Sequence, residues 1–319
     1  MTPTLQLKFL ALTTILIAHT TSMVVASTEA AGGHSISGMG DTKQTKPTGK
    51  YATVNGVKMY YEIYEPDRDG AARPPMALLH GALSTIRTDF SGVLSRLTGT
   101  RRIIAIEQQG HGHTADIADR PLNYEAMADD TAALLKQLGV QNADLFGYSM
   151  GGAIALQVAR RYPELVRTVI FAGGASYDRS GLYPELIEEE KTLKPENLAG
   201  SPFQKDYAMF APHPEDWPTL VEKIKRLDMT WRGMAPSDLQ AIKAPTLLVI
   251  GDADIVRPEH TVQMFRLLGG GVAGDLHGLT RAQLAVLPGT THISVVQRVE
   301  WLVSMVTAFT DAPSGDSKR

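Results

Sequence analysis

The chain has 319 residues, of which 43% are hydrophobic and 20% charged, a composition typical of a globular protein with a sizeable core. Its formal net charge is -3, and no run of Lys or Arg forms a basic stripe, so nucleic acid is not expected as a partner. The chain contains no cysteine. It therefore has no disulfide framework and no thiol for lipid attachment, and nothing in its chemistry conflicts with export.

The first 26 residues have the pattern of a secretory signal peptide. Lys8 precedes the mostly apolar run from Phe9 to Ala18, and Val24 and Ala26 fit a signal-peptidase site. A membrane anchor is the alternative, but the run is well short of the roughly 20 residues that a spanning helix needs. We expect residues 1–26 to be cleaved, which predicts a periplasmic or secreted protein without stable membrane insertion.

Residues 27–50 are rich in Gly, Ser and Thr and have almost no large apolar side chain, so we expect a flexible linker. The next segment, "YATVNGVKMYYEIYEP", has two alternating runs of β-prone residues on either side of Asn55-Gly56. This dipeptide between two such runs is a strong hairpin signal. The folded part of the chain is therefore expected to begin with two antiparallel strands at residue 51.

After the hairpin, short apolar runs that end near glycine alternate with amphipathic segments of helical length. This alternation predicts an α/β fold with a mostly parallel sheet covered by helices on both faces, formed by residues 51–175 and 244–311. Residues 312–319 are expected to form a disordered tail. The predicted strands lie in "PPMALLHG", "RRIIAIEQQG", "NADLFGYS", "VRTVIFAGG", "APTLLVIGD" and "AQLAVLPG".

Residues 176–243 interrupt this alternation, because they contain helical patterns such as "YPELIEEEKTL" and "HPEDWPTLVEKIKRLDMTW" but no strand-like run. An insertion at this point, where sheet strands end, predicts a helical cap over that edge. Its aromatic and methionine side chains could line an apolar pocket or pack the cap onto the body, and packing is the favoured interpretation. These residues are Tyr207, Met209, Phe210, Trp217 and Trp231.

The strongest chemical signal is Gly147-Tyr148-Ser149-Met150-Gly151, which follows a predicted strand and opens a predicted helix. In that context a sharp turn would hold Ser149 in a strained conformation with its hydroxyl above the sheet edge. A structural glycine-rich turn is the alternative. A serine nucleophile also needs a base and an orienting carboxylate at the ends of later strands.

Both partners are present. Asp252 and Asp254 follow one later strand, and His292 follows the last one. Because the carboxyl ends of parallel strands share one edge of the sheet, these side chains are expected to meet Ser149. An oxyanion needs two N–H donors, for which we expect Met150, directly after Ser149, and Ala82 in the turn "LLHGAL".

From about residue 51 to residue 310 the sequence resembles the α/β-hydrolase superfamily, in the branch with a His-Gly oxyanion turn, a G-x-S-x-G motif and a helical cap. The resemblance implies Ser149 as nucleophile, His292 as base and Asp254 as acid, with Asp252 as the fallback acid. One departure is the segment Glu107 to Thr114, "EQQGHGHT", where these relatives usually have D-x-R-G-x-G-x-S. The missing arginine leaves the charge of the substrate open.

Three other patterns have simpler interpretations. His80 is expected to be a structural residue of the oxyanion turn. His111 and His113 have no third ligand at a suitable spacing, so no metal site is expected. The "GGGVAG" of residues 269–274 matches a dinucleotide fingerprint, but it follows a helical pattern and no helix is expected to open on it, which favours a helix stop and a surface loop.

The sequence therefore predicts an exported serine hydrolase that cleaves a small, fairly apolar carboxylic ester or lactone without a cofactor or metal. Two alternatives remain: a cofactor-free haloperoxidase or perhydrolase with the same triad, and a ligand receptor built on a hydrolase body. The small-molecule substrate is the only partner that the sequence indicates, and it does not specify the oligomeric state.

Overall fold

The computed structural model describes residues 47–66 and 73–312. The predicted signal peptide, most of the predicted linker and the end of the predicted tail lie outside them. Strand β1 begins at Thr48, so the last three residues of the predicted linker belong to the hairpin instead. The physical reason is backbone pairing, since Thr48 is aligned with Ile63 on the neighbouring strand.

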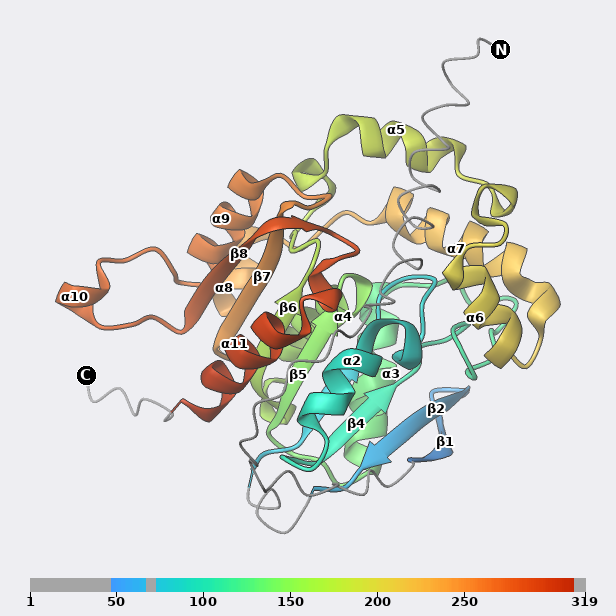
Figure 1. Ribbon diagram of the computed structural model, residues 1–319, viewed down its shortest axis with the longest axis horizontal. Helices are drawn as coiled ribbons and strands as arrows, with labels where there is room; N and C mark the ends of the chain where they lie inside the picture. Colours follow the sequence, from blue (N-terminus) through green and yellow to red (C-terminus); the bar gives the residue numbers. More distant parts are fainter. Residues whose placement is uncertain (1–46, 67–72, 313–319) are drawn as a thin grey trace, which may run out of the picture.

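The centre of the molecule is an eight-stranded sheet with the order β1-β2-β4-β3-β5-β6-β7-β8 (Figure 1). Strands β1, β2 and β4 pair antiparallel, and β4 through β8 run parallel in this order, which confirms the predicted mostly parallel sheet. The strands are β1 (Thr48–Val54), β2 (Val57–Tyr64), β3 (Met76–Leu79), β4 (Ile103–Ile106), β5 (Ala143–Tyr148), β6 (Val166–Ala172), β7 (Thr246–Ala253) and β8 (Ala282–Thr291).

The hairpin turn has the conformation that its sequence predicts. Asn55 and Gly56 have φ angles of 48° and 85°, and the pairing of Val54 with Val57 closes a two-residue loop. Positive φ at both central residues matches the right-handed twist of the two strands, and Asn-Gly tolerates it at low cost.

Helices cover both faces of the sheet because its central strands are apolar on both sides. In β3, Met76 and Leu78 contribute to one core cluster, and Ala77 and Leu79 contribute to the other. Helices α2 and α11 pack on the face that contains Met76 and Leu78, and α3, α4 and α9 pack on the face that contains Ala77 and Leu79. These helices are α2 (Ile86–Leu97), α3 (Tyr124–Gln137), α4 (Met150–Arg161), α9 (Pro258–Leu267) and α11 (Val299–Asp311).

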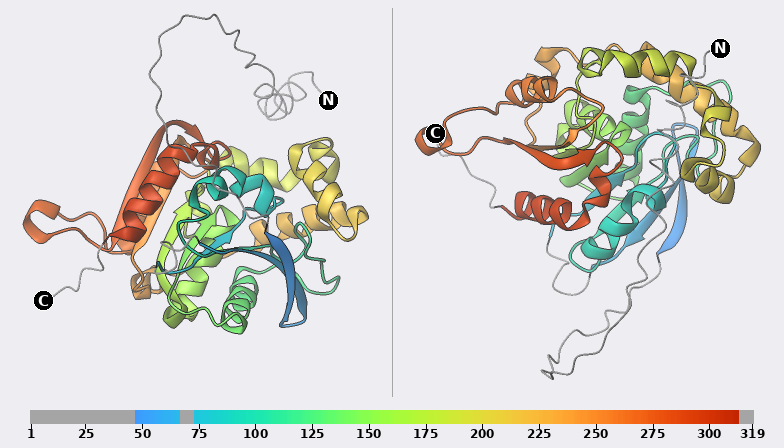
Figure 2. Two further views of the ribbon diagram at one scale, coloured as in Figure 1. Left: turned by 60° about the horizontal axis from the view of Figure 1, so that its bottom comes forward. Right: turned by 45° about the horizontal axis from the view of Figure 1, so that its top comes forward.

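Four helices lie between β6 and β7, in the segment predicted as a cap: α5 (Pro184–Thr192), α6 (Pro202–Phe210), α7 (Trp217–Thr230) and α8 (Pro236–Ala241). Figure 2 shows α5, α6 and α7 grouped on one side of the body. The last helix differs from the prediction, because α8 packs against α4 and α9 with Leu239 fully buried. An ion pair of 2.8 Å between Arg160 and Asp238 also ties α8 to α4.

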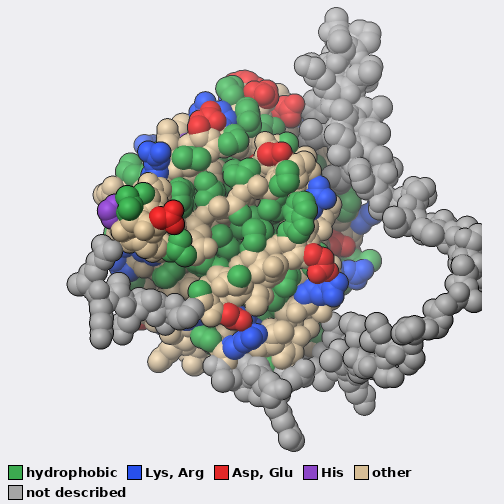
Figure 3. Space-filling view, turned by 60° about the vertical axis from the view of Figure 1, so that its left-hand side comes forward, with side chains coloured by type: hydrophobic (Ala, Val, Ile, Leu, Met, Phe, Trp, Pro, Cys, Tyr) green, Lys and Arg blue, Asp and Glu red, His purple; other side chains and the backbone are tan. Residues whose placement is uncertain are grey.

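The glycine-rich segment after α9 stops that helix, as predicted, with Gly269 at a φ of 96°. The loop that follows contains a single helical turn, α10 (Gly274–His277), which the sequence interpretation missed. This loop projects from the body, and Figure 3 shows hydrophobic side chains gathered on that side of the molecule. No helix within residues 47–66 and 73–312 is long and apolar enough to cross a membrane.

Candidate active site

Ser149 occupies the sharp turn between β5 and α4. Its φ is 52° and its ψ is -117°, a conformation that a residue with a side chain rarely adopts. The turn is possible because glycines surround it: a Cβ on Gly147 would lie 2.1 Å from the Gly151 oxygen, and one on Gly151 would lie 2.0 Å from the Leu79 oxygen. The backbone N–H of Ser149 donates to Ala172 of β6 over 2.9 Å, which anchors the turn to the sheet.

The ends of three strands bring Ser149, His292 and Asp254 together. His292 Nε2 lies 3.0 Å from Ser149 Oγ, and His292 Nδ1 lies 2.9 Å from Asp254 Oδ1. Because a carboxylate only accepts, the Nδ1–H tautomer donates to Asp254 and leaves Nε2 free to accept the serine proton. This arrangement can activate a hydroxyl as a nucleophile.

Asp254 is held as a carboxylate inside the protein. Burial alone would raise the pKa of Asp254, but the hydrogen bond and charge of His292 and the N–H groups of Gly174 and Ile255 lower it below its ordinary value. Asp252 lies elsewhere: it is exposed and accepts from the N–H groups of Gly289 and Thr290. Asp254, and not Asp252, therefore contacts the imidazole.

The two expected oxyanion donors lie in the same pocket as Ser149, since Ala82 and Met150 both line it. Within the described part of the chain, neither backbone N–H donates to a protein acceptor. The turn that contains Ala82 is held by a residue that sequence reasoning missed, Asp89 of α2. Its carboxylate accepts from Gly81 N–H over 2.7 Å and from the Ser84 hydroxyl.

Asp89 is almost fully buried, and burial raises its pKa to about 6 against the opposing hydrogen bonds from Ser84 and Gly81.

Tyr148 is a second residue at the site that sequence reasoning missed. Its hydroxyl donates to the main-chain oxygen of His292 over 3.1 Å, and its ring lies 5.3 Å from the imidazole. The position directly before Ser149 was the only available signal for Tyr148, and it says nothing of this contact.

His80 packs beneath the oxyanion turn. Its Nδ1 lies 2.7 Å from the Gly81 oxygen and its Nε2 accepts from Gln108 N–H over 3.1 Å, so the neutral ring links two loops. Burial and the neighbouring His111 lower the pKa of His80 to about 4. These contacts agree with a structural role for His80.

The segment that departs from the usual pattern is held by Glu107. This buried carboxylate accepts from the main-chain N–H of His113 over 2.6 Å and lies 2.9 Å from its Nδ1. His111 is fully buried and lies apart from this pair, with Nδ1 at 2.9 Å from the Gln109 oxygen. Among the described residues, no group of three His, Asp or Glu side chains is arranged to hold a metal ion.

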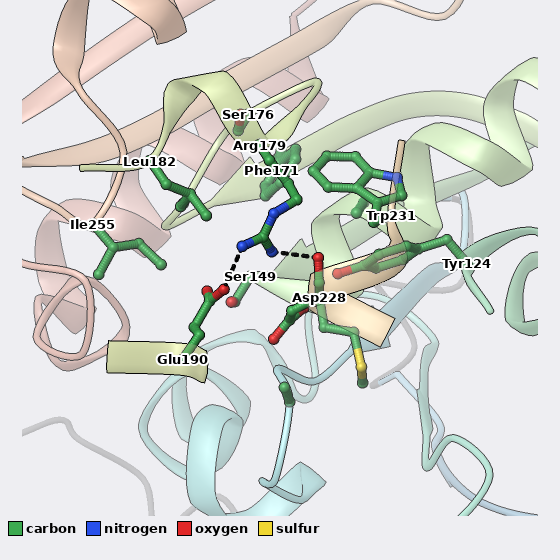
Figure 4. Close-up of a pocket in the computed structure, with 14 residues that line it drawn as sticks. Tyr124, Ser149, Phe171, Ser176, Arg179, Leu182, Glu190, Asp228, Trp231 and Ile255 are labelled. Carbon is green, nitrogen blue, oxygen red and sulfur yellow. Dashed lines mark hydrogen bonds and ion pairs between the residues drawn. The ribbon is translucent and has the colours of Figure 1, made fainter. Parts of the chain in front are cut away.

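The pocket beside Ser149 encloses about 120 Å³ between the sheet edge and the cap. Leu182, Ile255 and Phe171 give it an apolar part, but Arg179 and Glu190 also line it (Figure 4). The lining is thus mixed, with charged side chains beside apolar ones. It also includes Ala82, Tyr124, Ser149, Met150, Ala153, Gly174, Ser176, Asp228 and Trp231.

Of the five aromatic and methionine residues singled out in the cap, only Trp231 lines this pocket. Tyr207 and Trp217 are buried and pack against each other, with ring centroids 5.4 Å apart. Met209 is 63% exposed, and the Phe210 ring lies 5.0 Å from His113. Tyr207 and Trp217 therefore pack the cap, and Trp231 both packs against the same core cluster and lines the pocket.

An eight-stranded, mostly parallel sheet with a serine on a strained strand-to-helix turn defines the α/β-hydrolase class of proteins. The model of the alpha/beta hydrolase family matches residues 76–304, and the chain belongs to this family.

Among curated proteins, the chain is 30% identical over 225 residues to the mouse (Mus musculus) "Serine hydrolase BPHL", covering 67% of this chain and 73% of that protein. Two solved structures have the same fold. The enol-lactonase from Burkholderia xenovorans LB400 matches with a TM-score of 0.60 and 19% identity, over 82% of this chain and 99% of that one. Carboxylesterase CesB from Bacillus subtilis matches with a TM-score of 0.63 and 16% identity, over 84% and 93% of the two chains.

Proposed function

We propose that this α/β hydrolase cleaves a small carboxylic ester or lactone through an acyl-enzyme on Ser149. The observation that carries the proposal is the continuous chain of contacts from Ser149 Oγ to His292 Nε2 and from His292 Nδ1 to Asp254. The strained φ of Ser149 supports it, because such strain concentrates at functional residues. The serine hydrolase, the carboxylesterase and the enol-lactonase to which this chain is similar are enzymes of the same chemical kind.

In the proposed reaction, Ser149 Oγ attacks the carbonyl carbon of the substrate while His292 Nε2 accepts the hydroxyl proton. Asp254 stays ionised, holds the imidazole tautomer and stabilises the imidazolium that forms. The negative charge on the carbonyl oxygen is stabilised by the N–H groups of Ala82 and Met150, which have no competing protein acceptor in the described residues.

The tetrahedral intermediate then collapses, the C–O bond to the leaving group breaks, and His292 gives its proton to the departing alkoxide. Water attacks the acyl-enzyme with His292 again as the base, and a second collapse releases the carboxylic acid and restores Ser149. A lactone gives a single product, a hydroxy acid, because the new carboxylic acid and hydroxyl group stay in one molecule.

The test uses Ser149→Ala with Ser91→Ala as a matched control, because Ser91 is an exposed serine of α2. We expect wild type and Ser91→Ala to hydrolyse short-chain esters and to be labelled by a fluorophosphonate probe, and Ser149→Ala to lose both. Labelling without turnover of any ester or lactone would favour a ligand receptor. Peroxide-dependent halide oxidation that exceeds ester hydrolysis would favour a perhydrolase.

We also propose that the enzyme acts outside the cytoplasm, on the basis of the signal-like pattern of residues 1–26. Cell fractionation of the full chain and of a form lacking residues 1–26 tests this proposal. We expect only the full chain to be exported, with an N-terminus shortened by about that length. An uncleaved full chain in the cytoplasmic fraction would contradict it.

A further inference from the structure

Three charged side chains of the cap segment face the pocket that contains Ser149. Arg179 comes from the turn before α5, Glu190 from α5 itself and Asp228 from the last turn of α7 (Figure 4). Their charges are not balanced, because two carboxyl groups face a single guanidinium. The pocket is therefore suited to a substrate of a particular charge, which the proposed reaction alone does not specify.

The Arg179 guanidinium is already occupied by protein acceptors. It donates one hydrogen bond to Glu190 over 2.7 Å and another to the main-chain oxygen of Asp228. A substrate carboxylate would have to compete with Glu190 for the cation, and it would approach the Asp228 carboxyl as well. Like charges in so confined a space repel strongly, so the pocket disfavours an anionic substrate.

The Asp228 carboxyl group, in contrast, has no hydrogen-bonded or ion-paired partner within residues 47–66 and 73–312. It is partly buried beside the last carbonyl groups of α7, where the helix dipole favours cations over anions. Burial and the negative charge of Glu190 raise the pKa of Asp228 to about 7, against the opposing charge of Arg179. A cationic ligand at this position would donate hydrogen bonds to the carboxylate and place a positive charge beside it.

The surroundings of Asp228 also suit a small ammonium group. Tyr124 and Trp231 line the same pocket with ring centroids 5.4 Å apart, and aromatic rings attract cations. The volume of about 120 Å³ limits the ligand to a few heavy atoms beyond the reacting carbonyl.

We propose that the pocket selects small esters whose acyl part carries a protonated amine, with the Asp228 carboxylate as the acceptor for that ammonium group. Asp228 is then a specificity-determining residue, and Glu190 acts by keeping Arg179 paired. The inference rests on the proposed ester hydrolysis and adds the charge of the substrate to it.

Three ethyl esters of similar length and different charge test the inference. Ethyl β-alaninate carries an ammonium group, ethyl butyrate is its neutral counterpart and monoethyl succinate carries a carboxylate. We compare kcat/KM at neutral pH after dividing each value by the uncatalysed hydrolysis rate of the same ester. We expect the wild type to favour the ammonium ester over the neutral one by about tenfold or more, as one charge-assisted hydrogen bond allows.

The matched variants separate recognition from folding. Asp228→Asn keeps the shape of the side chain, and we expect it to abolish the preference while turnover of ethyl butyrate changes less than about threefold, since the neutral ester needs no charge. Glu190→Gln is expected to raise turnover of the succinate ester by releasing Arg179. Glu189→Gln, a neighbouring exposed carboxylate on α5, is expected to change none of the three values.

Protection of Ser149 gives a second readout, in which n-butylamine should slow fluorophosphonate labelling of the wild type more than of Asp228→Asn. A wild type that hydrolyses ethyl butyrate at least as well as ethyl β-alaninate would overturn the inference and leave the proposed hydrolysis intact. A preference for the succinate ester would identify Arg179 as the recognition group instead. Loss of all three activities together with loss of labelling would contradict the proposed function itself.

Discussion

The two sides of the pocket are built in different ways. On the sheet side, backbone N–H groups and buried carboxylates fix Ser149, Asp254 and the oxyanion turn. On the cap side, helix α5 buries none of its residues, and the pocket is lined by charged side chains that contact one another. In the proposed function, the reacting groups therefore lie on the hydrogen-bonded sheet side, whereas substrate selection depends on ion-paired side chains of the cap. The predictions below test this division.

The largest expected effect is that of Asp254→Asn, with Asp252→Asn as its matched control. An amide cannot stabilise the imidazolium, and it can hold the wrong tautomer of His292, so we expect kcat for ester hydrolysis to fall about 10³- to 10⁴-fold. Asp252 is exposed and accepts from the backbone N–H groups of Gly289 and Thr290, and its variant should keep nearly full activity. Equal losses in both variants would contradict the assignment of the acid.

The second effect comes from the frame of the oxyanion turn. Asp89→Ala leaves the buried N–H of Gly81 without its acceptor, and we expect the free energy of unfolding to fall by about 1–3 kcal/mol. Because the turn also positions Ala82, kcat should fall about 10-fold or more at unchanged KM. Asp206→Ala is the control, since that carboxylate contacts Thr88 and not the turn. Denaturant unfolding and steady-state kinetics measure the two effects.

A smaller effect is expected from pH on the cap side. Because the pKa of Asp228 is about 7, its carboxylate forms as the pH rises through that value. The preference for ethyl β-alaninate over ethyl butyrate should then increase severalfold between about pH 6 and pH 8, while the amine stays protonated. Within the described part of the chain, the other charged or titratable groups that interact with Asp228 are Glu190, Arg179 and Tyr124.

In Asp228→Asn the same ratio should be independent of pH, and turnover of the neutral ester alone should follow the same profile in both proteins. A ratio that rises equally in wild type and Asp228→Asn would assign the pH dependence to another group.

The smallest effect concerns the contact between Tyr148 and His292. Tyr148→Phe removes one hydrogen bond to the main chain of His292 and retains the ring, so we expect kcat/KM to fall only a few-fold, equivalent to about 0.5–1.5 kcal/mol. Tyr51→Phe changes an exposed ring and serves as control. An unchanged kcat/KM in Tyr148→Phe would show that this hydrogen bond does not position the imidazole.

The sequence predicted most of the sheet, because its short apolar runs end near glycine and alternate with segments of helical length. The hairpin at Asn55-Gly56 and the mostly parallel pairing of the later strands follow from local patterns of this kind. It missed α10, a single turn within a glycine-rich loop, and it did not predict that α8 would pack on the body, since packing partners are distant in the chain. It also gave no sign that Arg179, Glu190 and Asp228 would line one pocket, since these residues lie apart in the chain.

The sequence by itself determined the residues that can do chemistry: a serine between glycines, an acid and a histidine, each after a buried strand. It did so because parallel strands end at one edge, so their sequence positions imply proximity. The family resemblance favoured Asp254 over Asp252, but only the tertiary structure showed the contact of Asp254 with His292 and how the charges of Arg179, Glu190 and Asp228 combine. Those outcomes depend on distances of a few ångströms between side chains far apart in the chain, and no local pattern encodes them.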